Sequence, residues 1–183
     1  MARVPLFEQR DQLSPPAQKA YDQIASSRGH VIGPFQVLLH SPELAGRVAA
    51  LGQYIRFEGT LPVGVRETAV IAAAREMDCA FEWSVHESLA RAAGVPDETI
   101  AVIAQRRGLD GLSARERIVI AFARESFQRH RVSDDVFAAA LAEWGTPGVV
   151  ELVTTIGYYG MLAMILNAAA VEPAPGTPRL PLP

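Results

Sequence analysis

Signals that start and end helices recur along the whole chain, whereas no segment shows the polar–apolar alternation of a half-buried strand. Ser14 precedes a Pro-Pro pair and Ser41 precedes Pro42, an arrangement typical of an N-cap followed by proline in the first helical turn. Ser113 and Glu116 have the spacing of a capping box. These signals predict an all-α chain of about eight helices.

The helices are expected between these signals, with breaks at Gly29–Gly33, Gly59, Gly94 and Gly145. We expect them over residues 14–27, 43–58, 62–77, 82–93, 96–107, 113–129, 133–144 and 147–171. The segment EPAPGTPRLPLP (172–183) is too rich in proline to be helical, and we expect an extended arm on its own or a neighbouring subunit. A chain of 183 residues is long enough for one core, so residues 1–183 are expected to form a single domain.

The overall composition narrows the class of protein. Hydrophobic residues make up 49% and charged residues 20% of the chain, as in a folded globular protein. The net charge of −3 provides no electrostatic case for nucleic acid, so we expect no nucleic-acid partner. Cys79 is the only cysteine, which excludes an internal disulfide and suits a reducing compartment. The N-terminal MARVPLFEQRD lacks an apolar signal-peptide core, and we expect a cytoplasmic protein.

The segment VVELVTTIGYYGMLAMILNAAAV (149–171) is about as long as a bilayer span. It contains Glu151 and Asn167, has two tyrosines in its middle, and lacks basic flanks. We therefore expect a long helix in a soluble core or subunit interface, and no membrane partner.

An eleven-residue pattern occurs twice. RETAVIAAARE (66–76) and RERIVIAFARE (115–125) are identical at eight of eleven positions. This predicts two helices that present the same face to one core, consistent with a duplicated helical hairpin. The second copy is followed by SFQRHRV, without a thiol, so chemistry is expected at the first copy.

The stretch MDCAFEWSVHESLARAAGV (77–95) carries the thiol and an imidazole. In a helix, Cys79, Glu82, Trp83 and His86 share one face. Cys79 then lies at the helix N-terminus, where the dipole and free amides stabilise a thiolate. If the preceding helix packs antiparallel, Glu67 lies beside the same face, and a thiol, an imidazole and two carboxylates converge between two helices.

Each of these residues also has an ordinary structural interpretation. A lone cysteine in a helix is often inert packing, and Trp83 is expected in the core. His86 could be a half-buried histidine bonded to Glu82, and Glu67 could form a surface ion pair with Arg66.

LPVGVRETAVIAAAREMDCAFEWSVHESLARAAGVPDETI resembles the central segment of the carboxymuconolactone decarboxylase and alkylhydroperoxidase D-like superfamily. GPFQVLLHSPELAGRVAALGQYIRFEGTLP before it and the apolar segment 149–171 after it are also similar to this family, so the resemblance covers about residues 30–171. It implies an all-α fold with its core in that range. It also implies a homo-oligomer, commonly a trimer or hexamer, which would explain the apolar last helix.

The resemblance assigns the candidate catalytic residues. The peroxidase branch of the family uses a glutamate, a C-x-x-C motif and a histidine four residues after it. Glu67 matches the glutamate, Cys79 the first cysteine and His86 the histidine, but Glu82 stands in place of the second cysteine. In the family the second thiol attacks the peroxide and the first resolves it, so the dithiol peroxidase cycle is not available to this chain.

Two reactions remain open to an enzyme of this composition. In a cofactor-independent decarboxylation of a small carboxylated lactone or related acid, His86 could polarise the carbonyl or deliver the proton, with Glu67 or Glu82 setting its tautomer and charge. An arginine should hold the anionic substrate, and Arg56, Arg66 and Arg75 are near in sequence. A single-cysteine alkyl hydroperoxidase would instead need Cys79 exposed and acidic, with an external thiol as resolving partner.

Two further interpretations concern the same residues. Glu67, Glu82 and His86 could bind a divalent ion with Cys79 as a fourth ligand, although no metal or cofactor is expected because no second histidine is near. The chain could also be a non-catalytic small-ligand-binding protein or a structural oligomer. An enzyme should line a solvent-reaching pocket with these residues, whereas a structural protein should seal them.

Overall fold

The computed structural model describes residues 2–181, and in this part of the chain all regular structure is helical. The last two residues of the proline-rich tail lie outside the described residues, and residues 172–181 contain no helix. The fold class predicted from the caps is confirmed. The α-helices are α1 (Pro15–Arg28), α2 (Pro34–Leu38), α3 (Pro42–Gln53), α4 (Val63–Glu76), α5 (Ala80–Ala92), α6 (Asp97–Ala104), α7 (Ala114–Gln128) and α8 (Asp134–Ala169).

The predicted helices are close to the observed ones, with differences at some boundaries, in the short helices and in the caps. The helix expected to Glu58 is α3 followed by a π-helical turn, η2 (Tyr54–Glu58), and Gly59 ends it as predicted. Helix α2 and the 3₁₀ turn η1 (Arg10–Gln12) were not expected, because such short helices carry little periodic signal. Ser14 and Ser41 stand at N-cap positions, but neither side chain makes a capping hydrogen bond.

The chain forms two compact units. The first comprises Met1–Gly59 with Met164–Glu172, and the second comprises Thr60–Ala163 with Pro173–Pro183. The single domain over residues 1–183 remains a prediction. In the first unit α1 and α2 pack against α3, and the N-terminal arm is held where the Arg3 amide donates to the carbonyl of Ala169.

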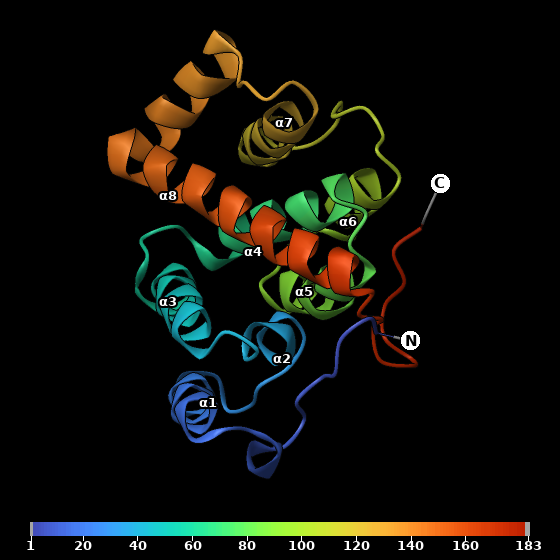
Figure 1. Cartoon of the computed structure of the whole chain (residues 1–183). Helices are drawn as coiled ribbons and strands as arrows, with labels where there is room; N and C mark the ends of the chain where they lie inside the picture. The colour runs from blue at the N-terminus through green and yellow to red at the C-terminus, as the bar shows by residue number, and fades with distance from the viewer. Residues whose placement is uncertain (1, 182–183) are drawn as a thin grey trace. The chain divides into compact units, whose positions relative to one another are not determined.

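The second unit is built around α4, which packs against α5, α6 and α7 (Figure 1). Nine consecutive residues of α4, Glu67–Arg75, are buried, so this helix is covered all round rather than along one stripe. Small side chains allow such close packing, because four of these nine are alanines. Helices α4 and α7, which carry the repeated pattern, pack on each other.

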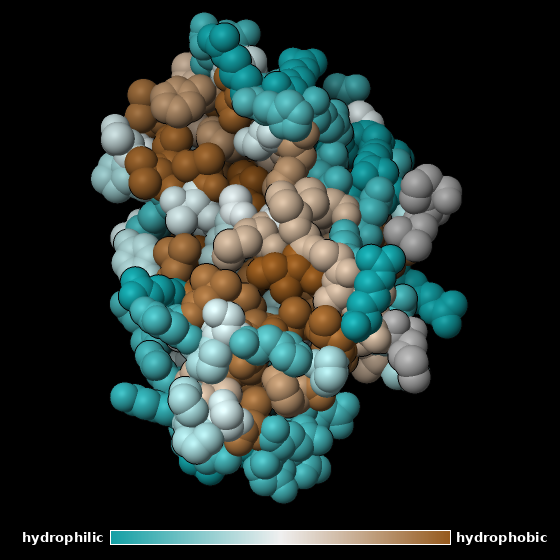
Figure 2. Space-filling view, in the orientation of Figure 1, coloured by the Kyte–Doolittle hydropathy of each residue, from teal (hydrophilic) through white to brown (hydrophobic). Residues whose placement is uncertain are grey.

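The long helix α8 bends at Gly145, whose φ of 64° and ψ of 179° are not helical. The sequence predicted this break, with a new helix from Pro147. By length and composition α8 is apolar enough to cross a membrane, but 56% of its most apolar window is buried within the protein, as in the core helix of a soluble protein. Apolar side chains also reach the surface along α8 (Figure 2), among them Val150 and Val153.

Two helix–helix turns of the second unit are bonded to each other. Asp78 follows the end of α4 and Arg106 follows the end of α6, and both have left-handed backbone conformations, with φ of 46° and 50°. The Arg106 guanidinium donates to the Asp78 carboxylate at 3.0 Å and to the carbonyl of Arg75 at 2.9 Å. The guanidinium of Arg75 also donates to Asp78. These bonds offset the conformational cost of a non-glycine residue at such positions and fix the turn that leads into α5.

Candidate functional site

Glu67 lies in the second turn of α4 and is 3% exposed. A carboxylate is rarely buried without a partner, because the loss of hydration is unfavourable unless hydrogen bonds or opposite charge replace it. Its neighbour Arg66 approaches one carboxylate oxygen at 3.4 Å, from a side chain that is 12% exposed. Glu67 is therefore not in the surface ion pair that the sequence left open.

Helix α5 supplies the other candidates. Cys79 is its N-cap residue, as predicted, and the amide of Trp83 donates to the Cys79 carbonyl. Glu82 and His86 follow at one-turn spacing and are both 4% exposed. Trp83 is 2% exposed and belongs to the core, as expected.

The structure brings Glu67, His86 and Glu82 together. His86 Nδ1 lies 2.8 Å from Glu67 Oε2, so this ring nitrogen donates its N–H to the carboxylate of the neighbouring helix. His86 Nε2 lies 3.6 Å from Glu82 Oε2, beyond hydrogen-bond distance but within reach of a charge interaction. Glu67 therefore sets the histidine tautomer, and Glu82 flanks the other nitrogen.

Cys79 does not have the properties that peroxide chemistry requires. Its side chain is 1% exposed. Burial is the main cause that raises the pKa of the Cys79 thiol to about 11; the charge of Glu82 acts in the same direction, and the hydrogen bonds from the backbone of Glu82 and Phe81 oppose it. The expected stabilisation of a thiolate at the N-terminus of α5 is therefore present but outweighed by burial. The lone thiol is protonated and shielded at neutral pH.

Tyr159 is a residue of this site that the sequence did not single out. Its ring meets the His86 ring edge to face, with centroids 4.8 Å apart, and Tyr158 packs on Tyr159 in the same way at 5.3 Å. Tyr159 is 3% exposed and comes from α8, more than seventy residues along the chain. A pair of adjacent tyrosines within the apolar segment 149–171 was the available signal.

The three candidate arginines have different surroundings. Arg66 is beside Glu67. Arg75 is buried at the opposite end of α4, where Asp78 holds it, and desolvation together with Arg106 lowers its pKa from the ordinary value. Arg56 belongs to the first unit and stacks on the Phe57 ring at 5.2 Å. Of these three, the structure places Arg66 at the candidate site.

A metal-binding arrangement is not found at these residues. Within residues 2–181, no group of three or more histidine, cysteine, aspartate and glutamate side chains is arranged to hold a metal ion. One nitrogen of His86 is already used in the bond to Glu67.

The burial of these side chains favours the structural interpretation over the catalytic one. The side chains of Glu67, Glu82 and His86 are each only 4–5% exposed, so the expected open lining of a solvent-reaching pocket is not what these side chains present. A substrate would reach His86 only when neighbouring side chains move.

Comparison with known proteins agrees with this fold. Residues 42–125 match the model of the carboxymuconolactone decarboxylase family, a stretch that contains Glu67, Cys79, Glu82 and His86. No curated protein matches the sequence.

Several solved structures have the same fold over nearly the whole chain. The debrominase Bmp8, as a cysteine-to-alanine variant in complex with 2,3,4-tribromopyrrole, is similar with a TM-score of 0.76 and 14% identity, covering 96% of this chain and 95% of that one. An uncharacterized peroxidase-related protein from Ralstonia eutropha JMP134, with an alkylhydroperoxidase AhpD core, gives 0.74 and 19% over 95% and 93%. A peroxidase-related protein from Silicibacter sp. TM1040 gives 0.75 and 14% over 95% and 92%. At such identities the likeness shows the fold and not the reaction.

Proposed function

Because the chain belongs to the carboxymuconolactone decarboxylase and AhpD-like superfamily, we propose that it is an enzyme of that superfamily whose chemistry is proton transfer by His86. The proposed substrate is a small carboxylated lactone or a related acid, and the reaction is a decarboxylation that needs no cofactor. One observation carries the proposal: His86 Nδ1 and Glu67 Oε2 are 2.8 Å apart in a buried pair formed by two different helices.

The proposed reaction requires a proton donor beside the substrate. The bond between the substrate carboxylate and the adjacent carbon breaks, carbon dioxide leaves, and the electron pair remains as an enolate delocalised into the lactone. Protonated His86 carries N–H groups on both ring nitrogens; Nδ1–H is held by Glu67, and Nε2–H is given to the carbon. Solvent water returns a proton to His86, so one proton is consumed for each carbon dioxide released.

The neighbouring residues have supporting roles in this proposal. Glu67 fixes the ring and its tautomer, and Glu82 stabilises the cationic ring through its position 3.6 Å from Nε2. Arg66 would orient the substrate carboxylate, because its guanidinium is the one beside Glu67. Tyr159 restrains the imidazole from α8.

Two other functions remain as alternatives. A single-cysteine alkyl hydroperoxidase is disfavoured, because Cys79 is 1% exposed and its pKa is raised to about 11. A non-catalytic protein, in which Glu67 and His86 form a buried structural pair, is favoured by the 4–5% exposure of both side chains.

We also propose that the protein is a cytoplasmic homo-oligomer, a trimer or hexamer. Val150 and Val153 on α8 are 56% and 44% exposed, and Met164 further along is 56% exposed. Apolar side chains on one helix surface are typical of a subunit interface.

The test measures loss of a carboxymuconolactone-type substrate and release of carbon dioxide by wild type, His86→Gln and Cys79→Ser. We expect His86→Gln to reduce turnover by about 10²–10⁴-fold and Cys79→Ser to leave it unchanged. His130→Gln is the matched control, because His130 is an exposed histidine outside the site. Turnover by wild type that His86→Gln does not reduce would overturn the proposal, and peroxide consumption lost only in Cys79→Ser would establish the hydroperoxidase.

A further inference from the structure

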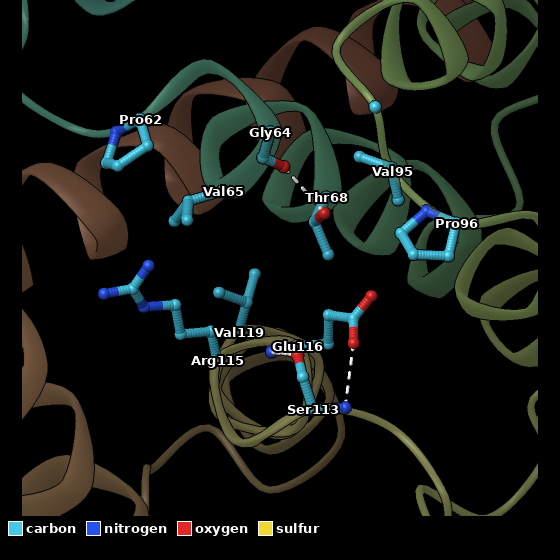
Figure 3. Close-up of a pocket in the computed structure, with 11 residues that line it drawn as sticks. Pro62, Gly64, Val65, Thr68, Val95, Pro96, Ser113, Arg115, Glu116 and Val119 are labelled. Atoms are coloured by element: carbon cyan, nitrogen blue, oxygen red, sulfur yellow. Dashed lines mark hydrogen bonds between the residues drawn. The ribbon is translucent and has the colours of Figure 1, made fainter.

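The second copy of the repeated pattern lines a cavity of its own. The cavity has a volume of about 360 Å³ and lies within the second unit, between the N-terminal halves of α4 and α7 and the link from α5 to α6 (Figure 3). Its volume falls in the range typical of small-molecule pockets, about 300–1,000 Å³. The Arg–Glu pair that begins the second copy, Arg115 and Glu116, lies at this cavity.

The walls of the cavity are apolar. Val65 of α4 faces Val119 of α7 across it, and Val95 forms a third side (Figure 3). Pro62 and Pro96 line it at the ends of the facing segments. Such walls suit the hydrocarbon part of a ligand, because burying apolar surface is the main favourable term for a small molecule in a preformed pocket.

The two charged residues differ in what already binds them. Glu116 accepts hydrogen bonds from the Ser113 amide and the Thr99 hydroxyl. Although burial opposes its ionisation, the bonds from Ser113 and Thr99 hold the pKa of Glu116 below the ordinary value. The carboxylate is therefore ionised and engaged within the protein.

Arg115 is the group that a ligand can engage. Its side chain is 66% exposed and forms a surface ion pair with Glu143. An exposed ion pair contributes little stability, so exchanging it for a ligand carboxylate is favourable when the apolar part of the ligand is buried at the same time. Figure 3 shows Arg115 and Glu116 on opposite sides of Val119. An anion would therefore enter the cavity on the side of Arg115.

We propose that this cavity binds a small monocarboxylic acid with an apolar body, whose carboxylate pairs with Arg115 and whose body lies between Val65 and Val119. In the first copy the equivalent arginine, Arg66, is only 12% exposed and is directed to Glu67. The two copies therefore present different groups to a ligand. The inference is independent of the proposed reaction at His86, which none of the lining residues enters.

The experiment measures binding of 4-methylbenzoate by NMR of labelled valine methyl groups in the full chain. The neutral 4-methylbenzamide and the cationic 4-methylbenzylamine are compared as probes of similar size. We expect 4-methylbenzoate to shift the signals of Val65, Val95 and Val119, and the two analogues to bind at least about tenfold more weakly.

Four variants locate the binding. Arg115→Gln should raise the Kd of 4-methylbenzoate by about 10–100-fold, because a charge-assisted hydrogen bond is lost. Arg129→Gln is the matched control, since Arg129 is 69% exposed and also pairs with a glutamate, and it should bind as wild type. Val65→Phe should block the space between residues 65 and 119 and abolish binding, whereas His86→Gln should leave it unchanged.

Three results with the wild type and the arginine variants would overturn the proposal. They are no binding by wild type at millimolar probe, equal affinity in Arg115→Gln and Arg129→Gln, and equal binding of the acid and the amine. A loss in His86→Gln alone would place the probe at the candidate catalytic site instead, which also overturns it. Circular dichroism of Arg115→Gln confirms folding, which is expected because the side chain is exposed.

Discussion

Helices α4 and α7 carry nearly the same eleven residues, yet the equivalent glutamates of the two helices bond to different partners. Glu67 of α4 bonds to His86 of α5 in a buried pair, whereas Glu116 of α7 bonds to the Ser113 amide and to Thr99 of α6. The cause lies in where each helix begins. α7 begins at Ala114, which places Glu116 at the third position, where a glutamate can cap the helix.

In α4 the same pattern is deeper in the helix. α4 begins at Val63, so Glu67 is its fifth residue, out of reach of the N-terminal amides. Its carboxylate therefore bonds to a residue of another helix, the imidazole of His86 on α5. A shift of two residues in the helix start thus converts a capping residue into a candidate catalytic one.

The largest expected effect is on activity. Glu67→Gln should reduce turnover of the lactone substrate by about 10²-fold or more, because His86 loses the acceptor that orients it. Glu116→Gln should retain full turnover and lose about 1 kcal/mol of unfolding free energy instead. Kinetics over a pH range and urea unfolding of both variants check this. Equal losses of turnover in the two variants would show that the glutamates do not differ in role.

The thiol provides the second test. At pH 7 a pKa of about 11 leaves a thiolate fraction of about 10⁻⁴, so Cys79 should react with iodoacetamide far more slowly than a free thiol. Gln128 occupies the equivalent position after the second copy and is exposed, so Gln128→Cys should react rapidly in the same molecule. Peptide mass spectrometry distinguishes the two sites. Rapid labelling of Cys79 in the folded protein would contradict the burial described above.

A glycine of α8 tests the packing against α7. A Cβ atom at Gly160 would lie 2.6 and 2.8 Å from ring atoms of Phe127, so Gly160→Ala should destabilise the protein by about 1–3 kcal/mol. Gly157→Ala is the control, because its Cβ would meet nothing within 4 Å and alanine favours helix. Thermal unfolding measures both, and a stable Gly160→Ala would show that Phe127 moves without penalty.

The smallest effect concerns the cap itself. Ser113→Ala should lose about 1 kcal/mol of unfolding free energy at neutral pH, because the hydroxyl accepts a hydrogen bond from the Glu116 amide.

The pKa of Glu116 is lower in the folded than in the unfolded protein. Its contribution to stability is therefore present above the unfolded pKa and lost as the pH falls through the folded value. The stability difference between wild type and Glu116→Gln should therefore shrink in acid. A difference that grew in acid would reverse the sign assigned to Glu116.

Local features were predictable from sequence, and long-range ones were not. Glycine and proline positions located α4 and α5, the capping box located α7, and helical spacing placed Glu82 and His86 on one face. The approach of Glu67 was expected on the condition that α4 and α5 pack together. The role of Tyr159 could not be predicted, because it depends on how α8 crosses α5, and no local pattern encodes that contact.

Properties that depend on burial were also beyond local reasoning. The position of Cys79 at a helix N-terminus predicted an acidic thiol, and that position is correct. The depth of the residue reverses the consequence, because desolvation exceeds the effect of the backbone amides. In the same way the sequence offered three arginines, and only the packing distinguishes Arg66 from Arg75.

Because Asp78 and Arg106 are bonded to each other, the effect of a substitution at one position depends on the residue at the other. Glycine at either position would relax its own turn but remove one ion-pair partner of the other side chain, so the benefit of one change depends on the other. Substitutions there are expected to be tolerated as pairs and penalised singly. A library that varies the α4–α5 turn should therefore randomise both codons together, since screening either alone samples only the unfavourable intermediates.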